Sequence, residues 1–192
     1  MNRRSLLLSA AGAGLAVSGL TAAQGLAAAS ATDDELAFAS FGQATELLLA
    51  DFYARATAAR IATGPEARDL AHGALSASEH AAALANLLTD AGQTASVAED
   101  FEFQWPDGTF ATRRAVGRTG LEIARPLLGV YLTAAIGVSV ASYRTLFTTM
   151  AANVAQQVAA LSRLSGGRMV GLSFPPAVDV ETANNALEAY LG

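Results

Sequence analysis

Residues 37–57 constrain the fold more than any other stretch, because they place one acid on a largely apolar helix. On a period of 3.6 residues, Glu46 shares a stripe with Gln43 and Tyr53, while phenylalanines and leucines occupy much of the remaining circumference. Such a helix is mostly buried, and a buried carboxylate needs a metal ion, a hydrogen-bond partner, a proton or access to water. Two interpretations remain open: Glu46 is a ligand inside a helical bundle, or it is a structural acid satisfied by a neighbouring hydroxyl or placed at the helix edge.

Residues 1–31 predict an export signal. Arg3 and Arg4 precede an apolar run, and small residues at its end form a signal-peptidase cleavage pattern. The arginine pair resembles a bacterial twin-arginine signal. No charged residue lies between Arg4 and Asp33, so retention of the segment as a membrane anchor is the alternative. We expect residues 32–192 to form one domain without membrane contact, located in the periplasm, in the cell wall or outside the cell.

The composition of the mature chain excludes several partners and chemistries. Two of the twelve basic residues belong to the signal, whereas all seventeen acidic residues follow it, so residues 32–192 carry ten positive and seventeen negative charges and a net charge of −7. Nucleic acid is therefore not expected as a partner. The absence of Cys excludes disulfides and thiolate metal sites. The chain also lacks a Gly-x-Ser-x-Gly nucleophile motif and a phosphate-binding glycine loop.

Helix-start and helix-stop signals divide the mature chain into four long helices and a short one. Thr32 and Glu35 form a capping box, and Gly64 with Pro65 separates the first helix from the second. Pro126 predicts a kink or a break in the third helix. The expected helices span residues 32–62, 65–90, 112–138, 139–165 and 180–191. Four long helices with a long connection between the second and third are typical of an all-α, ferritin-like four-helix bundle.

The connection between the second and third helices contains alternating aromatic residues. Phe101, Phe103 and Trp105 alternate with polar residues, which predicts a partly extended flap, and we expect its aromatic side chains to pack on the bundle. An exposed aromatic strip, serving as a partner surface or a ligand lid, is the alternative.

Both histidines of the chain lie on the predicted second helix, and they point in different directions. His72 shares a stripe with polar residues and is interpreted as a surface residue. His80 lies on a stripe of Ala and Leu, where it is either a ligand or a core histidine with a satisfied ring.

Five short motifs occur in a characteristic order along the chain: residues 46–53, 100–103, 108–110, 129–132 and 174–192. With this order and spacing, the region from Leu36 to Gly192 resembles the bacterial exported ferritin-like domain proteins. The resemblance implies a di-metal carboxylate centre, with a Glu on each of the first and third helices and a Glu-x-x-His motif on each of the second and fourth.

Only two of the six implied ligands are present. Glu46 matches the acid of the first helix and His80 the histidine of the second. The remaining positions hold Ala77 on the second helix, the stretch Ala124, Arg125 and Pro126 on the third, and Val154 and Gln157, with Gln156 beside them, on the fourth. One Glu and one His cannot neutralise and bridge two cations in a bundle core.

Three interpretations of this degenerate site follow. Glu79 and Glu122 are substitute ligands, out of register, for a rebuilt two-metal site. Glu46 and His80, with Glu122, are the candidates for a mononuclear iron or manganese site. A third hypothesis pairs Arg125 with Glu46, so that a salt bridge takes the place of the metal.

The functional expectation is a non-catalytic binding or structural module of the cell envelope, without a cofactor and with a homo-oligomeric or envelope protein partner. The alternative is a residual metalloprotein that binds iron or manganese and oxidises iron or handles peroxide.

Overall fold

The structure is a computed structural model that describes residues 31–171 and 175–191. The predicted signal and its arginine pair lie outside the described residues. Within them the protein is all-helical, as expected, and no strand forms. The five α-helices are α1 (Asp33–Ala58), α2 (Gly64–Asp90), α3 (Arg113–Gly137), α4 (Ala141–Leu164) and α5 (Val180–Leu187), and the two single-turn 3₁₀-helices are η3 (Ala98–Asp100) and η4 (Glu188–Tyr190).

The helix boundaries agree with the sequence-based expectation except at three places. α5 ends at Leu187 instead of residue 191, and residues 188–190 form the 3₁₀-helix η4. The first helix ends at Ala58 instead of residue 62, because Arg60 has a positive φ of 53° that the α-helix does not allow. The third helix continues through Pro126, so the expected break is wrong. The capping box at the start of α1 is present, with Thr32 N–H donating to Glu35 and Glu35 N–H donating to Thr32.

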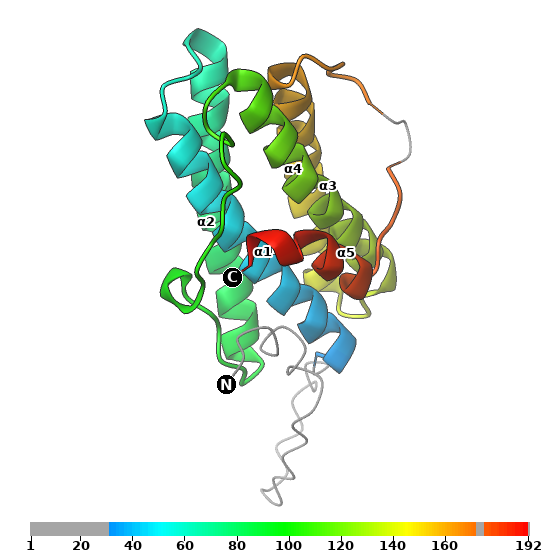
Figure 1. Ribbon diagram of the computed structural model, residues 1–192. Coiled ribbons are helices and arrows are strands. Elements are labelled where there is room, and N and C mark those ends of the chain that lie inside the picture. Colours follow the sequence, from blue (N-terminus) through cyan, green and yellow to red (C-terminus); the bar gives the residue numbers. More distant parts are fainter. Residues whose placement is uncertain (1–30, 172–174, 192) are drawn as a thin grey trace, which may run out of the picture.

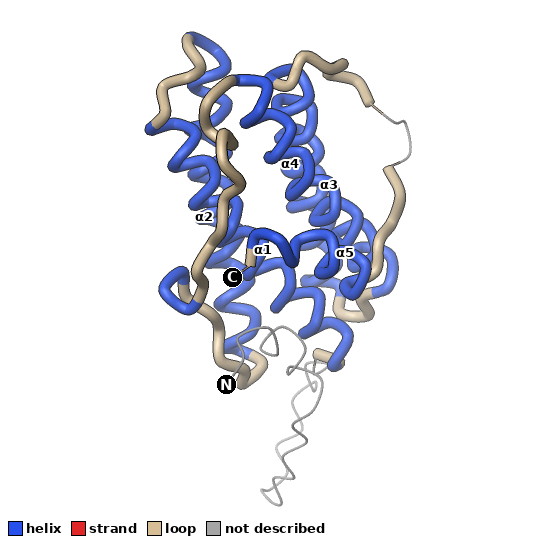
Figure 2. Tube along the Cα trace, in the orientation of Figure 1, coloured by secondary structure: helices blue, strands red, loops and turns tan. Residues whose placement is uncertain are grey.

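The four long helices form a bundle of two antiparallel pairs (Figures 1 and 2). α1 packs along α2, and α3 packs along α4, while α1 also contacts α3 and α2 contacts α4. α5 lies across α3 and α1. The core between them is built from Leu, Ile, Val, Ala and aromatic side chains, so burial of apolar surface is the main source of stability.

The connection 91–112 forms no strand, contrary to the alternation of its aromatic residues. A strand requires a partner ladder, and the connection makes only one isolated antiparallel bridge, between Phe103 and Leu191. The expectation that its aromatics pack on the bundle is confirmed for Phe103 and Trp105, which lie against the core. The Trp105 indole N–H donates to Asp51 over 2.8 Å, which fixes the connection to α1.

None of the helices in the described part of the chain combines the length and the apolar character that a membrane crossing requires.

Candidate functional site

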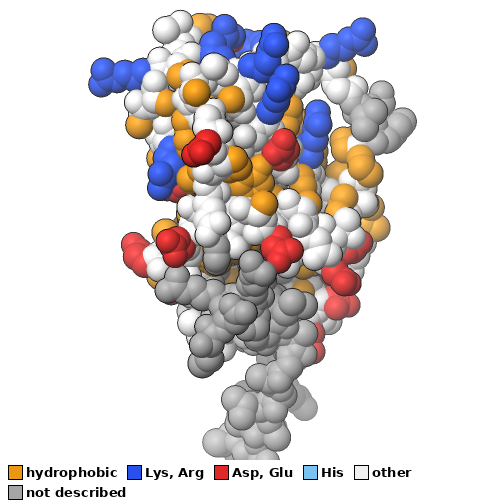
Figure 3. All heavy atoms as spheres, in the orientation of Figure 1, with side chains coloured by type: hydrophobic (Ala, Val, Ile, Leu, Met, Phe, Trp, Pro, Cys, Tyr) orange, Lys and Arg blue, Asp and Glu red, His pale blue; other side chains and the backbone are white. Residues whose placement is uncertain are grey.

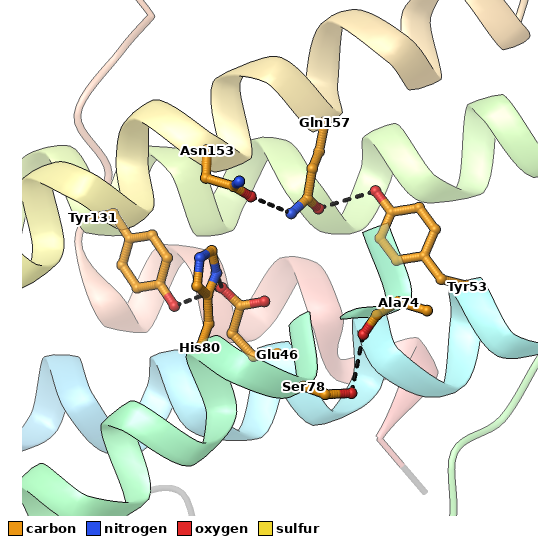
Figure 4. Close-up of polar contacts among 8 residues, drawn as sticks. All are labelled: Glu46, Tyr53, Ala74, Ser78, His80, Tyr131, Asn153 and Gln157. Carbon is orange, nitrogen blue, oxygen red and sulfur yellow. Dashed lines mark hydrogen bonds and ion pairs between the residues drawn. The ribbon is translucent and has the colours of Figure 1, made fainter. Parts of the chain in front are cut away.

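Glu46 lies at the centre of the bundle and is completely buried. Its carboxylate oxygen Oε1 accepts a hydrogen bond from the Tyr131 hydroxyl over 2.9 Å and lies 2.8 Å from Nδ1 of His80 (Figure 4). The three side chains come from α1, α2 and α3. The acid that the sequence singled out therefore joins three of the four long helices.

His80 combines a buried contact with partial access to solvent. Its side chain keeps 14% of its surface exposed, whereas Glu46 keeps none. With the carboxylate ionised, Nδ1–H donates to Glu46, and a charged imidazole adds an ion pair. His72, by contrast, is exposed as expected and does not take part.

Tyr131 reaches Glu46 because a glycine on α1 leaves room for its ring. A Cβ atom at Gly42 would lie 3.0 Å from the ring carbon Cε1 of Tyr131 and 3.1 Å from its hydroxyl oxygen. Any larger residue at position 42 would push the ring away from the carboxylate. The tyrosine is fully buried, so its hydroxyl needs the partner that Glu46 provides.

A second polar chain lies beside the first and includes the fourth helix (Figure 4). The Tyr53 hydroxyl donates to Oε1 of Gln157 over 3.0 Å, and the Gln157 amide donates to Oδ1 of Asn153 over 2.7 Å. A Cβ atom at Gly73 on α2 would lie 2.7 Å from the Tyr53 ring, so a glycine is needed there as well. We call the six side chains Glu46, His80, Tyr131, Tyr53, Gln157 and Asn153 the central polar cluster.

Burial controls the electrostatics of the cluster. It raises the pKa of Glu46 above its ordinary value of 4.5, although the hydrogen bond and the charge of His80 and the hydroxyl of Tyr131 act in the opposite direction. Burial also raises the pKa values of Tyr131 and Tyr53, and the nearby charge of Glu46 raises them further. Both hydroxyls therefore stay protonated and act as donors.

One atom of the cluster is left without a partner. Oε2 of Glu46 is buried and has no hydrogen-bond partner among the described residues. Figure 4 shows this oxygen directed toward the space between the two polar chains. An unpaired carboxylate oxygen in a core is costly, which is consistent with the raised pKa of Glu46.

The two substitute ligands are not brought to Glu46. Glu79 is exposed, although it is the neighbour of His80 in the sequence. Glu122 is also exposed and accepts a hydrogen bond from Tyr190, so it binds the C-terminal segment to α3. In both cases the helical period turns the acid away from the face that carries the cluster.

The proposed pair between Arg125 and Glu46 is wrong. Arg125 is exposed, and the partners of Glu46 are His80 and Tyr131. The third helix reaches the centre at Tyr131 and not in the stretch around Arg125. The His80 imidazole and the Tyr131 hydroxyl therefore hold the Glu46 carboxylate, in place of the Arg125 guanidinium that the hypothesis assigned to it.

Four members of the cluster were not identified as site residues from the sequence. Tyr131 lies in an apolar run of the predicted third helix, and Gln157 occupies the position of a missing ligand. The available signal was the tyrosine hydroxyl, because a tyrosine in an apolar run must find a polar partner when it is buried. Tyr53 also shared the stripe of Glu46. Asn153 carried no comparable signal.

The residues present do not fit a di-metal centre. Within the described ranges, no group of three or more His, Asp or Glu side chains is placed to hold a metal ion. At the fourth helix the cluster supplies amides, and at the third a phenol that burial keeps protonated, so Glu46 is its only carboxylate. Two bridged cations would remain largely uncompensated in this core.

A second buried carboxylate occurs on α1, near the start of the helix. Oε1 of Glu35 accepts hydrogen bonds from Ser139 N–H over 2.7 Å, from the Ser139 hydroxyl over 2.8 Å and from Val140 N–H over 3.2 Å. Its other oxygen accepts from Thr32 N–H. Burial acts to raise the pKa of Glu35, but these donors outweigh it and lower the pKa to about 2.

Comparison with known protein families finds no match for this chain, and comparison with functionally characterised proteins finds none either. Arguments about function therefore depend on the residues and contacts described above.

Proposed function

We propose that the chain is an exported ferritin-like four-helix protein in which the central polar cluster takes the place of a di-metal centre. In this proposal it serves as a non-catalytic binding or structural module of the cell envelope. The observation that carries the proposal is the set of contacts of Glu46, whose carboxylate is held by His80 and Tyr131. Because the protein itself supplies both partners of Oε1, this oxygen needs no cation to keep it in the core.

Three features support the ferritin-like assignment and the export. The long helices follow one another with short links at 59–63 and 138–140 and a long connection at 91–112, as in four-helix bundles with one crossover. Five sequence motifs resemble those of exported ferritin-like domain proteins. The paired Arg3 and Arg4 before an apolar run support a twin-arginine route.

The test of the metal-free centre is the metal content of the exported protein. The wild type would be purified without chelators and compared by mass spectrometry with Glu46→Gln and His80→Ala. We expect iron and manganese at background in all three proteins. Near-stoichiometric metal in the wild type that is lost in both variants would overturn the proposal.

A second candidate, a residual iron- or manganese-binding protein, is favoured by one observation. Oε2 of Glu46 is buried and has no partner in the described part of the chain, and His80 contacts the other oxygen of the same carboxylate, so a carboxylate oxygen and an imidazole occur in the same region. The Glu46 carboxylate and the His80 imidazole would fill only part of the coordination sphere of an iron or manganese ion, and water or an added ligand would fill the rest. The metal measurement separates the two candidates, since a mononuclear site gives up to one metal per chain.

Export is tested separately. Replacement of Arg3 and Arg4 by Lys keeps the charge of the signal but removes the arginine pair. We expect the variant to accumulate inside the cell, whereas unchanged export would contradict the twin-arginine assignment and leave the account of the bundle centre intact.

A further inference from the structure

The charged side chains are distributed unevenly along the bundle axis. Eight of the ten arginines that follow residue 31 lie at one end, which is formed by the end of α1, the start of α2, the start of α3 and the end of α4. We call this the basic end. On the face that Figure 3 shows, Arg side chains gather over this end, and Asp and Glu side chains dominate the other half of the molecule.

Most of the charge at the basic end is not neutralised within the protein. Three arginines form ion pairs: Arg55 with Asp51, Arg113 with Glu66, and Arg163 with Asp69. The other five are exposed and form no ion pair with the described residues: Arg60, Arg68, Arg114, Arg118 and Arg168.

The opposite end, formed by the start of α1, the end of α2 with the residues that follow it, the end of α3 and the start of α4, carries the complementary charge. We call it the acidic end. Asp33, Asp34, Asp90 and Glu99 are exposed there and form no ion pair with the described residues. Asp100 is exposed beside them and accepts a hydrogen bond from Val97 N–H. The one arginine of this end, Arg144, donates to the carbonyls of Val138 and Ser139.

Helix-end stability explains only part of this distribution: Asp33 and Asp34 in the first turn of α1, Arg55 in its last turn and Arg163 in the last turn of α4 suit the helix dipole. The four helices are antiparallel in pairs, so their macrodipoles largely cancel along the bundle axis. Arg113 and Arg114 occupy the first turn of α3, where no acid is present and where the dipole disfavours cations. Asp90 occupies the last turn of α2, where no basic residue is present and where the dipole disfavours anions. Arg114 and Asp90 therefore lie where the helix dipole disfavours their charge, and neither forms an ion pair with the described residues.

We propose that the basic end of one copy docks on the acidic end of a second copy, giving a head-to-tail assembly held by charge. A second copy is the partner whose charges complement both ends at once, whereas an anionic membrane or polymer would complement only the basic end. A contact between two different surfaces of the same chain is heterologous, and it produces rings or open rows of molecules. The proposal concerns the ends of the bundle and does not depend on what its centre contains.

The test is sedimentation velocity of the exported protein at low and high salt. Charges that are unpaired and exposed interact strongly at about 20 mM salt and are screened at about 500 mM. We expect assemblies that grow with protein concentration at low salt and a loss of affinity of at least about tenfold at high salt.

Two charge-reversal variants identify the surfaces. Arg114→Glu with Arg118→Glu alters the basic end, and Asp90→Arg with Glu99→Arg alters the acidic end. At Arg114 and Asp90 the new charge suits the helix dipole, so loss of folding does not confound the result. Each variant alone should be monomeric at low salt. Mixed, they should assemble again, because the intact acidic end of one variant complements the intact basic end of the other.

Arg125→Glu is the control, because Arg125 is exposed on α3 but lies outside both ends. This variant should assemble like the wild type. A wild type that stays monomeric at every salt concentration would overturn the proposal, as would assembly that neither reversal affects. Binding of the monomer to anionic lipid vesicles through the basic end, lost in Arg114→Glu with Arg118→Glu, would replace the second copy by a membrane and also overturn it.

Discussion

Glu35 and Glu46 are two buried carboxylates on the same helix, and their surroundings give them opposite electrostatic properties. Glu35 accepts four hydrogen bonds, three of them from backbone N–H groups, and its pKa is lowered to about 2. Glu46 accepts on one oxygen only, its other oxygen has no partner among the described residues, and burial raises its pKa. Donor number, and not burial alone, decides whether a buried acid stabilises this bundle.

The comparison also separates two roles. Glu35 satisfies N–H groups at the start of α4, where no side chain of α4 itself caps the helix. It is therefore a structural acid that joins α1 to α4. Glu46 has fewer donors than Glu35, and one of its oxygens is unsatisfied among the described residues, which is a property common at functional sites.

The sharpest test of the comparison is the amide variant of each acid. Glu35→Gln places an NH₂ group against the Thr32 N–H, and its remaining oxygen is a neutral acceptor for the bonds from Ser139 and Val140. We therefore expect a loss of about 2 kcal/mol in the free energy of unfolding. Glu46→Gln keeps an accepting oxygen and removes a buried charge, so we expect a change within about 1 kcal/mol. Urea unfolding at pH 7 measures the free energy of unfolding of both variants. Equal losses would contradict the statement that Glu35 and Glu46 contribute differently to stability.

The same contrast should appear in the pH dependence of stability, with opposite signs. Because the pKa of Glu35 is lowered in the folded state, its stabilising effect is present above pH 4.5 and is lost as the pH falls toward 2. Because the pKa of Glu46 is raised, its ionisation costs stability as the pH rises above 4.5. The stability difference between the wild type and Glu35→Gln should therefore shrink in acid, and the advantage of Glu46→Gln should grow with pH. Urea midpoints between pH 2 and pH 8 test both trends.

Removal of single hydroxyls distinguishes a bond to a charged group from one to a neutral group. Tyr131→Phe removes a donor from Glu46, and we expect a loss of about 2 kcal/mol at pH 7. Tyr53→Phe removes a bond to the neutral amide of Gln157, and we expect about 1 kcal/mol. If the Glu46→Gln background does not reduce the cost of Tyr131→Phe, the carboxylate at position 46 is not ionised at pH 7.

The smallest expected effect concerns one of the four bonds to Glu35. Ser139→Ala removes only the hydroxyl and leaves the backbone N–H in place, so we expect a loss of roughly 0.5–1 kcal/mol by urea unfolding. Thr133→Ala is a comparison, because its hydroxyl donates to backbone carbonyls and not to a carboxylate. A loss at position 139 that persists in Glu35→Gln would show that the serine acts through another contact.

The number of helices and most of their boundaries could be predicted from the sequence because they depend on local signals. Thr32 with Glu35 starts α1, Gly64 with Pro65 starts α2, and the apolar period extends both. The alternation of Phe101, Phe103 and Trp105 predicts a partly extended flap and indicates which side chains face the bundle. It does not supply a partner strand.

The candidate site could be predicted only in part. Glu46 and His80 were identified because a buried acid and an imidazole on an apolar stripe require an explanation within their own helices. Tyr131 and Gln157 depend on the register between helices, which the helical period of one segment does not contain. The same limit explains why Arg125 was wrongly paired with Glu46. It also explains why the contact of Glu35 with Ser139, at the start of α4, could not be predicted from the sequence of α1.

The most direct test of the central claim, that protein side chains satisfy Glu46 without a cation, is the melting temperature of chelator-treated protein with and without added Mn²⁺ or Fe²⁺. A metal that binds the folded state at 100 times its dissociation constant stabilises by about 2.7 kcal/mol, which raises the melting temperature of a domain of this size by roughly 5–10 °C. The account predicts no such rise in the wild type. A rise of this size that is absent from both Glu46→Gln and His80→Ala would contradict it and assign the centre to a metal.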